Sequence, residues 1–377
     1  MRSLVTLSAL AGFTSLAAAS SLKLASSYSG DTFFNGFYVN GSETDPTNYG
    51  NIHYVNSSVA TSDQLAYVNS AGNVILKVDN SSSDPNPGEY STFGRNTVMV
   101  ISNDTIVIGT LVAIDATHIP YGCSVWPSFW TLDTETGTDE NGEIDIIETV
   151  NLKSANQYSL HAKSGCTLVN DTSFPHTGTD LYTNCDYNYT LTGNEGCGIS
   201  ETASSSSVGS AFASNGGGVY AMYWSTDGIQ IWFFERSNIP SDLTSESPDP
   251  SSWDEPSASY PTSGCDPSTY FKSQSLIINT DICGAWAGSD SVFTSTGCSG
   301  SCADLVGTAS NYDTAYWEIQ YVKTFTSSGS SSASATGTST KTSTSSSSSS
   351  TSSSGTAQVT ASVLGLLAAM IVCAVMA

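Results

Sequence analysis

Basic residues are scarce in this sequence. Its 377 residues include ten Lys and Arg against 34 Asp and Glu, which gives a formal net charge of -24. A chain with this balance repels nucleic-acid phosphates and anionic membrane surfaces. The composition therefore argues against nucleic-acid binding, and no nucleic-acid partner is expected.

Several motifs of other enzyme classes are also missing. The sequence has no Gly-x-Ser-x-Gly elbow, no His-Glu-x-x-His helix and no phosphate-binding Gly-rich loop. Its four His are scattered and Cys-x-x-Cys pairs do not recur, so no metal site is predicted. We expect no nucleotide, redox or metal cofactor.

The first residues have the order of a secretory signal peptide. Arg2 precedes an apolar run at residues 4–16, and small residues follow at 17–19. We expect cleavage near Ala19, so that residues 1–19 are a signal peptide and the protein is secreted. Six Asn-x-Ser/Thr sequons agree with export; they lie at Asn40, Asn56, Asn80, Asn103, Asn170 and Asn188.

Two segments of unusual composition end the chain. Residues 326–356 are almost wholly Ser, Thr, Gly and Ala, which cannot bury a core and indicates a solvated stalk. An apolar run follows at 363–377, shorter than the roughly twenty residues that span a bilayer. Small residues at 352–355, a spacer and this tail match a lipid-anchor signal. We expect residues 357–377 to be removed and replaced by a glycosylphosphatidylinositol anchor. This anchor would hold the protein on the extracellular side of the cell membrane and in the cell wall. A tail-anchored span is the alternative.

Eight of the nine cysteines lie in the body of the chain, and Cys373 lies in the apolar tail. In an oxidising compartment an even set forms up to four disulfides, whose connectivity cannot be read from the sequence. Buried free thiols are the alternative. The eight are Cys123, Cys166, Cys185, Cys197, Cys265, Cys283, Cys298 and Cys302.

Residues 20–325 have the pattern of one β-rich domain. Runs at 218–224 and 229–234 are rich in aromatic and β-branched residues, and Ser-Thr-Asp-Gly at 225–228 is typical of a hairpin turn. Long helical periodicity is absent, and no repeat of 20 to 50 residues is present. The sequence predicts an all-β sandwich rather than a propeller or solenoid.

The stretch "GEIDIIE" at residues 142–148 holds three acids, Glu143, Asp145 and Glu148, at spacings of two and three. A regular strand would send Glu148 to the face opposite the other two. One extra residue at 146–147, a β-bulge, would place all three acids on one face, as a pair of catalytic carboxyls in a glycosidase requires. The alternative is an amphipathic strand with solvated acids and buried isoleucines.

An aromatic run precedes the acids. Residues 122–130, "GCSVWPSFW", include Trp126 and Trp130, whose rings are of the kind that offers sugars a flat apolar face. Core packing explains such aromatics equally well. The conjunction of acids, aromatics, export and an anchor favours a polysaccharide hydrolase.

With these residues the chain resembles glycoside hydrolase family 16, and within it the fungal endo-1,3(4)-β-glucanases, which are laminarinase-like. The similar segments cover nearly all of residues 25–323 in order. Besides the acid motif they are "YSGDTFFNGF" from Tyr28, Arg95 with "TVMVIS", "HIPYGCSVWPSFW" from His118, "NQYSLHAKSGC" from Asn156, "NGGGVYAMYW", "WFFERSNIP", "CGAWAG" from Cys283 and "AYWEIQYV" from Ala315.

The resemblance implies a jelly-roll β-sandwich of two antiparallel sheets with a concave cleft for β-glucan. It also implies a retaining, double-displacement mechanism. By motif position, the nucleophile is Glu143, the acid/base is Glu148, and Asp145 assists between them. His161 matches a cleft position, with a structural histidine as the alternative. Together with His161, we expect three tryptophans to bind substrate: Trp126, Trp130 and Trp224.

Four departures from the family pattern bear on subsite preference. Residues 139–141 stand where the family usually has Trp-Pro, and Thr149 stands where Gly is common. Tyr223 occupies a frequent acid position before the Trp, and Ala285 replaces the usual Asp. These departures leave the reaction class unchanged and the linkage preference open.

The leading hypothesis is a monomeric, secreted, anchored enzyme that hydrolyses 1,3- or mixed 1,3-1,4-β-glucan. A cell-wall transglycosylase of the same fold is the first alternative. The crosslinking branch of the family has strict two-residue acid spacing, so "EIDIIE" favours a glucanase by analogy. A glucan-binding wall protein without catalysis is the second alternative; such family members lack the catalytic glutamates.

Overall fold

The computed structural model describes residues 22–41, 44–45, 47–83, 94–188 and 195–328. The predicted signal peptide, the anchor signal and nearly all of the stalk lie outside these residues. Within them, no helix is long and apolar enough to cross a membrane.

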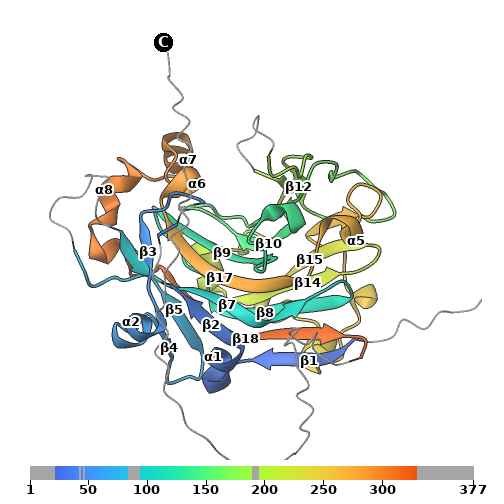
Figure 1. Cartoon of the computed structure of the whole chain (residues 1–377), viewed down its shortest axis with the longest axis horizontal. Helices are drawn as coiled ribbons and strands as arrows, with labels where there is room; N and C mark the ends of the chain where they lie inside the picture. The colour runs from blue at the N-terminus through green and yellow to red at the C-terminus, as the bar shows by residue number, and fades with distance from the viewer. Residues whose placement is uncertain (1–21, 42–43, 46, 84–93, 189–194, 329–377) are drawn as a thin grey trace, which may run out of the picture. The chain divides into compact units, whose positions relative to one another are not determined.

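Two sheets of eight strands dominate the described chain, and their strand pairs are antiparallel (Figure 1). Sheet A has the order β16-β15-β14-β8-β18-β5-β4, with β1 paired to β18. Its strands are β1 (Lys23–Tyr28), β4 (Ala66–Val68), β5 (Val74–Lys77), β8 (Thr110–His118), β14 (Gly218–Trp224), β15 (Gly228–Glu235), β16 (Ala258–Pro261) and β18 (Tyr316–Thr326).

Sheet B has the order β12-β13-β11-β10-β9-β17-β7-β2. Its strands are β2 (Phe37–Asn40), β7 (Met99–Ile106), β9 (Val125–Leu132), β10 (Glu143–Glu148), β11 (Gln157–His161), β12 (Thr179–Asp180), β13 (Cys197–Ser200) and β17 (Gln274–Ile282). A parallel pair, β3 (Ile52–Tyr54) and β6 (Arg95–Thr97), forms a third, small sheet. The predicted all-β sandwich of antiparallel sheets is confirmed.

One apolar core joins the inner faces of the two large sheets. Phe129, Ile144 and Tyr158 enter it from sheet B, and Tyr220 and Ile319 enter it from sheet A; all five are 1% exposed or less. Because alternate residues of a strand point to opposite faces, each sheet keeps a second face away from this core. We call the second face of sheet B the site face.

The predicted hairpin is present as β14 and β15. Every residue of β14 pairs in register with β15, from Gly218 opposite Glu235 to Trp224 opposite Ile229. The turn closes where the Ser225 N–H donates to the Gly228 carbonyl at 2.9 Å. Gly228 has a φ of +145°, which L side chains rarely adopt.

The helices are short, six residues or fewer among the described residues. The α-helices are α1 (Phe33–Gly36), α2 (Ser57–Ser62), α3 (Gly209–Ser214), α4 (Ser241–Thr244), α5 (Pro267–Tyr270), α6 (Gly284–Ala287), α7 (Asp290–Ser295) and α8 (Cys302–Val306). The 3-10 turns are η1 (Gly30–Thr32), η2 (Asp139–Asn141), η3 (Arg236–Asn238), η4 (Pro250–Ser252) and η5 (Ala309–Tyr312).

All eight body cysteines form disulfides, as predicted. The pairs are Cys123–Cys298, Cys166–Cys265, Cys185–Cys197 and Cys283–Cys302. Helices α6, α7 and α8 gather at one end near β3 (Figure 1). The Cys283–Cys302 disulfide joins the residue before α6 to the first residue of α8. The Cys123–Cys298 disulfide joins the segment before β9 to the segment after α7.

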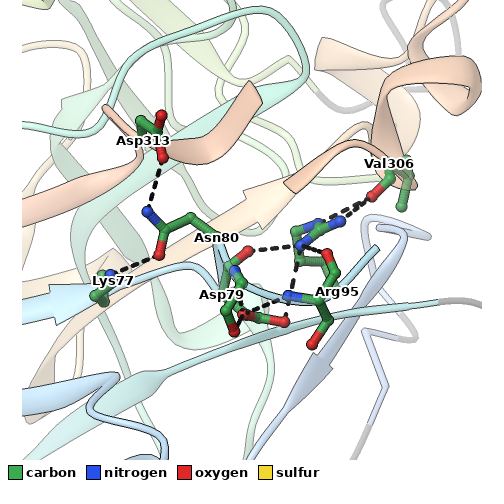
Figure 2. Close-up of polar contacts among 8 residues, drawn as sticks. Lys77, Asp79, Asn80, Arg95, Val306 and Asp313 are labelled. Carbon is green, nitrogen blue, oxygen red and sulfur yellow. Dashed lines mark hydrogen bonds and ion pairs between the residues drawn. The ribbon is translucent and has the colours of Figure 1, made fainter. Parts of the chain in front are cut away.

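A buried arginine fastens the same end (Figure 2). Arg95 has no exposed surface, and its guanidinium donates to the Asp79 carbonyl at 2.7 Å and to the Val306 carbonyl at 2.9 Å. The Asp79 carboxylate lies 3.8 Å away and the Tyr312 ring 4.5 Å away. A buried cation is costly unless it is paired and hydrogen-bonded. Arg95 therefore ties the 79–82 segment to the end of α8.

Candidate active site

A bulge interrupts β10 at the predicted place. Against β9, Asp145 pairs with Trp130 and Ile147 pairs with Phe129, so two residues of β10 oppose one. Against β11 the register also shifts, between Asp145 and Glu148. An extra residue reverses the alternation of faces beyond it. The predicted bulge at 146–147 is confirmed.

The bulge separates the isoleucines of β10 from its acids. Ile144, Ile146 and Ile147 are buried in the core between the sheets, each 1% exposed or less. The alternation on each side of the bulge then places the acids on the site face. Those acids are Glu143, Asp145 and Glu148.

Neighbouring strands supply the side chains around the acids. Residues directly opposite in an antiparallel pair project from the same face. The cross-strand partners are His161 and Leu132 for Glu143, Ser159 and Trp130 for Asp145, and Gln157 and Ser128 for Glu148.

Glu148 is held at both its carboxyl and its backbone. Trp126 donates from its indole Nε1 to Glu148 Oε1 at 2.8 Å. The Glu148 N–H donates to Asn156 Oδ1 at 2.9 Å. Burial, followed by the negative charge of Asp145, raises the pKa of Glu148 to about 8, and the Trp126 hydrogen bond acts against this rise. Glu148 is therefore protonated at neutral pH.

His161 lies between the other two acids. Its Nε2 is 3.3 Å from Asp145 Oδ2 and 3.8 Å from Glu143 Oε1, and all three side chains are at most 16% exposed. Burial lowers the pKa of His161, but the contact with Asp145 and the charge of Glu143 outweigh it and raise the pKa to about 10. A protonated imidazole therefore faces this pair of acids at neutral pH.

The two carboxyls beside His161 are also perturbed. Burial, and then the charge of Asp145, raise the pKa of Glu143 well above its usual value, whereas His161 lowers it. Burial raises the pKa of Asp145, again with His161 acting against the rise. Carboxyls this close cannot all ionise freely. The His161 cation favours the ionised form of all three carboxyls, and its nearest contacts are to Asp145 and Glu143.

An aromatic wall stands beside Glu148. The rings of Trp126 and Trp286 meet edge to face with centroids 5.5 Å apart, and the Lys153 ammonium lies 4.6 Å above the Trp286 ring. Trp286 belongs to α6, so the disulfide-linked helical end contributes to this wall. The opposite charge of Lys153 also lowers the pKa of Glu148.

Trp130 on β9 is the cross-strand partner of Asp145. Its indole Nε1 donates to Asn279 Oδ1 at 2.7 Å, which fixes the ring against β17. The side chain remains partly exposed on the site face, next to the acids. This placement is compatible with the predicted contact to substrate, which stays a prediction for both Trp126 and Trp130.

The structure contradicts the prediction that Trp224 binds substrate. Trp224 lies on β14 in sheet A, is 1% exposed and packs in the core against Phe271, with ring centroids 6.1 Å apart. Its neighbour Tyr223 packs on the other face of sheet A, beside Trp253. Both are thus on the sheet that does not carry the acids, and Tyr223 has no direct bearing on the subsites.

Two clusters within the described chain have the spacing of metal ligands. In the first, the donor atoms of Glu143, Asp145 and His161 lie within 4.8 Å of one another. The same three groups form the ion pairs described above, with His161 Nε2 3.3 Å from Asp145 and 3.8 Å from Glu143. The second consists of Cys166, Cys185 and Cys265, whose thiols are all used in disulfides.

A cavity of about 740 Å³ lies away from the acids, beside the end of β15. Its wall includes Trp253, Glu235 and Asp242. Glu235 accepts hydrogen bonds from Ser204 and Ser206 at 2.7 Å, which lower its pKa, and Asp242 accepts from the Trp253 indole at 3.0 Å. Because its pKa is lowered, Glu235 is a poor proton donor at neutral pH.

Three residues of the site escaped sequence reasoning. Lys153, Asn156 and Trp286 lie in segments that the family resemblance includes or borders, but nothing in their local pattern distinguishes them. Lys153 and Asn156 follow the acid motif closely, at the turn into β11. A search for polar residues near the turn that follows the acids would have found these two.

The comparisons with known proteins agree with this geometry. Residues 37–325 match the family described as the XgeA-like, catalytic GH16 domain, where GH16 is glycoside hydrolase family 16. The chain belongs to this family. Its described body is therefore a glycoside hydrolase domain.

Curated relatives share this domain. A probable glycosidase of Schizosaccharomyces pombe is 41% identical over 309 residues, which are 81% of this chain and 70% of that protein. An endo-1,3(4)-β-glucanase of Emericella nidulans is 36% identical over 323 residues, 83% of this chain and 49% of that protein. The chain thus spans about half the length of the Emericella protein.

Solved structures of the family have the same fold. Laminarinase 16A from Phanerochaete chrysosporium, with β-glucans in donor and acceptor sites, is 34% identical with a TM-score of 0.74, over 81% of this chain and 99% of that one. An elongating family 16 β-1,3-glucosyltransferase is 38% identical with a TM-score of 0.72, over 81% and 100%. The predicted jelly-roll fold is confirmed.

Proposed function

We propose that this chain is a retaining endo-β-glucanase that hydrolyses 1,3- or mixed 1,3-1,4-β-glucan. The observation that carries the proposal is the bulge of β10, which brings Glu143 and the protonated Glu148 to one face. The relatives named endo-1,3(4)-β-glucanases and the laminarinase with bound β-glucans support this substrate class.

In the first step Glu143 is the nucleophile. Its carboxylate attacks the anomeric carbon while Glu148 gives its proton to the departing glycosidic oxygen. A glycosyl ester forms on Glu143 and the shortened glucan leaves. The Glu148 pKa of about 8 keeps this acid protonated at neutral pH, and the Trp126 indole stabilises the carboxylate that remains.

In the second step the roles of Glu148 reverse. Its carboxylate removes a proton from water, the water oxygen attacks the anomeric carbon, and Glu143 leaves as a carboxylate. Two inversions give net retention. His161 and Asp145 do not exchange protons with the sugar in this scheme; the charged imidazole, 3.8 Å from Glu143, favours the ionised form of the nucleophile.

Product analysis tests the reaction. The ectodomain, residues 20–325, is incubated with laminarin, lichenan and chitin oligomers, and the products are sized. We expect short oligosaccharides from laminarin or lichenan and none from chitin. Proton NMR during the first minutes should show the β-anomer first, because the configuration is retained. Early appearance of the α-anomer would disprove the double displacement.

A transglycosylase is the second candidate. Its support is the structural likeness to the elongating β-1,3-glucosyltransferase, which is 38% identical. Both reactions pass through the same ester on Glu143, and they differ only in whether water or a sugar hydroxyl accepts the glycosyl group. Products longer than the starting oligosaccharide, in excess over shorter ones, would favour transfer. A glucan-binding protein without catalysis would release no product at all.

We also propose that the enzyme is secreted as a monomer and held at the cell surface and wall by a lipid anchor. The support is the order of the sequence at each end of the chain and the four disulfides of the body, which suit an oxidising compartment. A phosphoinositide-specific phospholipase should release the protein from membranes. Retention after this treatment, with Cys373 still present in the mature protein, would favour a spanning tail.

A further inference from the structure

Asn156 connects the turn before β11 to the bulge of β10. The residue is fully buried, with no exposed surface. Its Oδ1 accepts the N–H of Glu148 at 2.9 Å, and its Nδ2 donates to the carbonyl of Ile146 at 3.0 Å. This is the orientation of the amide that satisfies both partners, since an N–H needs an acceptor and a carbonyl needs a donor.

The two bonds fall where the strand ladder is broken. The register between β10 and β11 shifts between Asp145 and Glu148, and Asn156 contacts the backbone inside this gap. Buried backbone groups that lose a ladder partner destabilise a fold unless another group replaces it. The planar amide of Asn156 supplies both an acceptor for the Glu148 N–H and a donor for the Ile146 carbonyl.

Asn156 is itself held at its backbone. Its N–H donates to Ser207 Oγ at 3.1 Å, and its carbonyl accepts the N–H of Glu201 at 2.9 Å. Ser207 and Glu201 are buried as well. The amide therefore has a defined position from which it can fix the bulge, and it cannot touch a glucan, because no atom of it reaches the surface.

We propose that Asn156 is a positioning residue that aims the general acid Glu148 by clamping the bulge. The inference rests on the proposed glucanase function. Trp126 holds the Glu148 carboxyl and Asn156 holds its backbone, so the two contacts together define the direction of the acid. Loss of the clamp should leave Glu143 unaffected and impair those steps that need a proton from Glu148.

Two substrates with different leaving groups separate this role from a general loss of structure. Laminarihexaose has an alkoxide-like leaving group that needs a proton from Glu148. A 2,4-dinitrophenyl β-glycoside of laminaribiose releases dinitrophenolate, which leaves without a proton when Glu143 attacks the anomeric carbon. For both, kcat/KM reports the step up to formation of the ester on Glu143.

The test variant is Asn156→Asp, which has the same shape and lacks the donor for the Ile146 carbonyl. We expect kcat/KM to fall about 100-fold for laminarihexaose, the scale of general acid catalysis, and to stay within about threefold for the aryl glycoside. Asn156→Ala removes both bonds without adding a buried carboxyl. If Asn156→Asp fails to fold, Asn156→Ala provides the same comparison.

Ser102→Ala is the matched control. Ser102 is also a buried side chain that joins an N–H to a carbonyl at a register shift, but the shift lies between β7 and β17, and its partners are the Leu276 N–H, at 2.8 Å, and the Asp104 carbonyl, at 2.6 Å. This variant should lose stability and change both kcat/KM values in the same proportion. An Asn156 variant that behaves in this way would overturn the proposal, and so would one with wild-type rates on laminarihexaose. A wild-type protein that cleaves neither substrate would instead overturn the glucanase function and the inference with it.

Discussion

Strands β10 and β14 lie in the middle of opposite sheets, and they differ in how regularly they pair with their neighbours. Strand β14 pairs residue for residue with both β8 and β15 along Gly218–Trp224. Strand β10 changes register against both of its neighbours. Regular alternation sends Tyr220, Met222 and Trp224 of β14 into the core. The bulge of β10 instead sends two successive isoleucines inward and all three acids outward.

The bulge leaves backbone groups of β10 without ladder partners, and it places the acids on one face. A regular strand satisfies its backbone through the ladder alone, whereas β10 needs the amide of Asn156 at the interruption. In return, Glu143 and Glu148 share a face at a spacing that a regular strand cannot give. The acids then lie beside a histidine cation and an aromatic wall, and burial perturbs their pKa values.

The largest effect should come from Glu143→Gln on β10. The amide keeps the size of the side chain but cannot attack the anomeric carbon, so we expect kcat on laminarin to fall at least about 1,000-fold. Glu235→Gln, on the regular hairpin strand β15, is the matched control and should stay within a few-fold of wild type. Near-wild-type turnover in Glu143→Gln would remove Glu143 from the mechanism.

Shortening β10 tests the bulge itself. Deletion of Ile147 makes the strand regular, like β14, and keeps the final acid on the site face; we expect activity to fall about 10- to 100-fold because the acid is re-aimed. Deletion of both Ile146 and Ile147 turns this acid toward the core and should abolish activity. Laminarin hydrolysis and near-UV circular dichroism are measured for each. Higher activity in the double deletion than in the single one would contradict the parity argument.

A smaller effect is expected at the contact between Trp126 and Glu148. The indole N–H stabilises the ionised carboxylate and so lowers the pKa of Glu148. Trp126→Phe removes this donor, and the pKa should rise above about 8. The alkaline limb of the kcat/KM profile should then move to higher pH, with kcat lowered about tenfold. Trp130→Phe, whose indole bonds Asn279, should leave that limb in place.

The smallest effect on activity is expected for Trp224→Phe in β14. The substitution leaves a small cavity in the core, so the free energy of unfolding should fall by about 1 to 3 kcal/mol. The KM for laminarin should not change, because Trp224 faces away from the site. Trp130→Ala on the site face should raise KM severalfold while thermal melting changes less. A raised KM in Trp224→Phe would show that Trp224 contributes to substrate binding after all.

Short sequence patterns were enough to predict several features of the structure. The hairpin of β14 and β15 was predicted from two aromatic runs and a turn sequence, and the bulge was predicted from the parity of acids spaced two and three apart. Both arguments depend only on the alternation of a strand. The even number of body cysteines predicted complete disulfide pairing, but eight cysteines allow 105 connectivities, and only the fold selects one.

Trp224 shows where such patterns fail. The segment Gly218–Trp224 has apolar side chains at successive positions, so its alternation does not tell which face meets the core. Packing of β14 between β8 and β15, against the inner face of sheet B, decides this. Trp286 and Glu148 are likewise 138 positions apart in the sequence, and disulfide-linked helices bring that ring to the site.

The sequence by itself determined which acids are available and that one extra residue would align them, because the side-chain parity of a strand is a local property. Only the tertiary structure decided how these acids ionise. The pKa of Glu148 depends on burial, on Asp145, and on Trp126 and Lys153 from other segments. Electrostatic interactions and desolvation depend on distance in space, and the fold alone sets those distances.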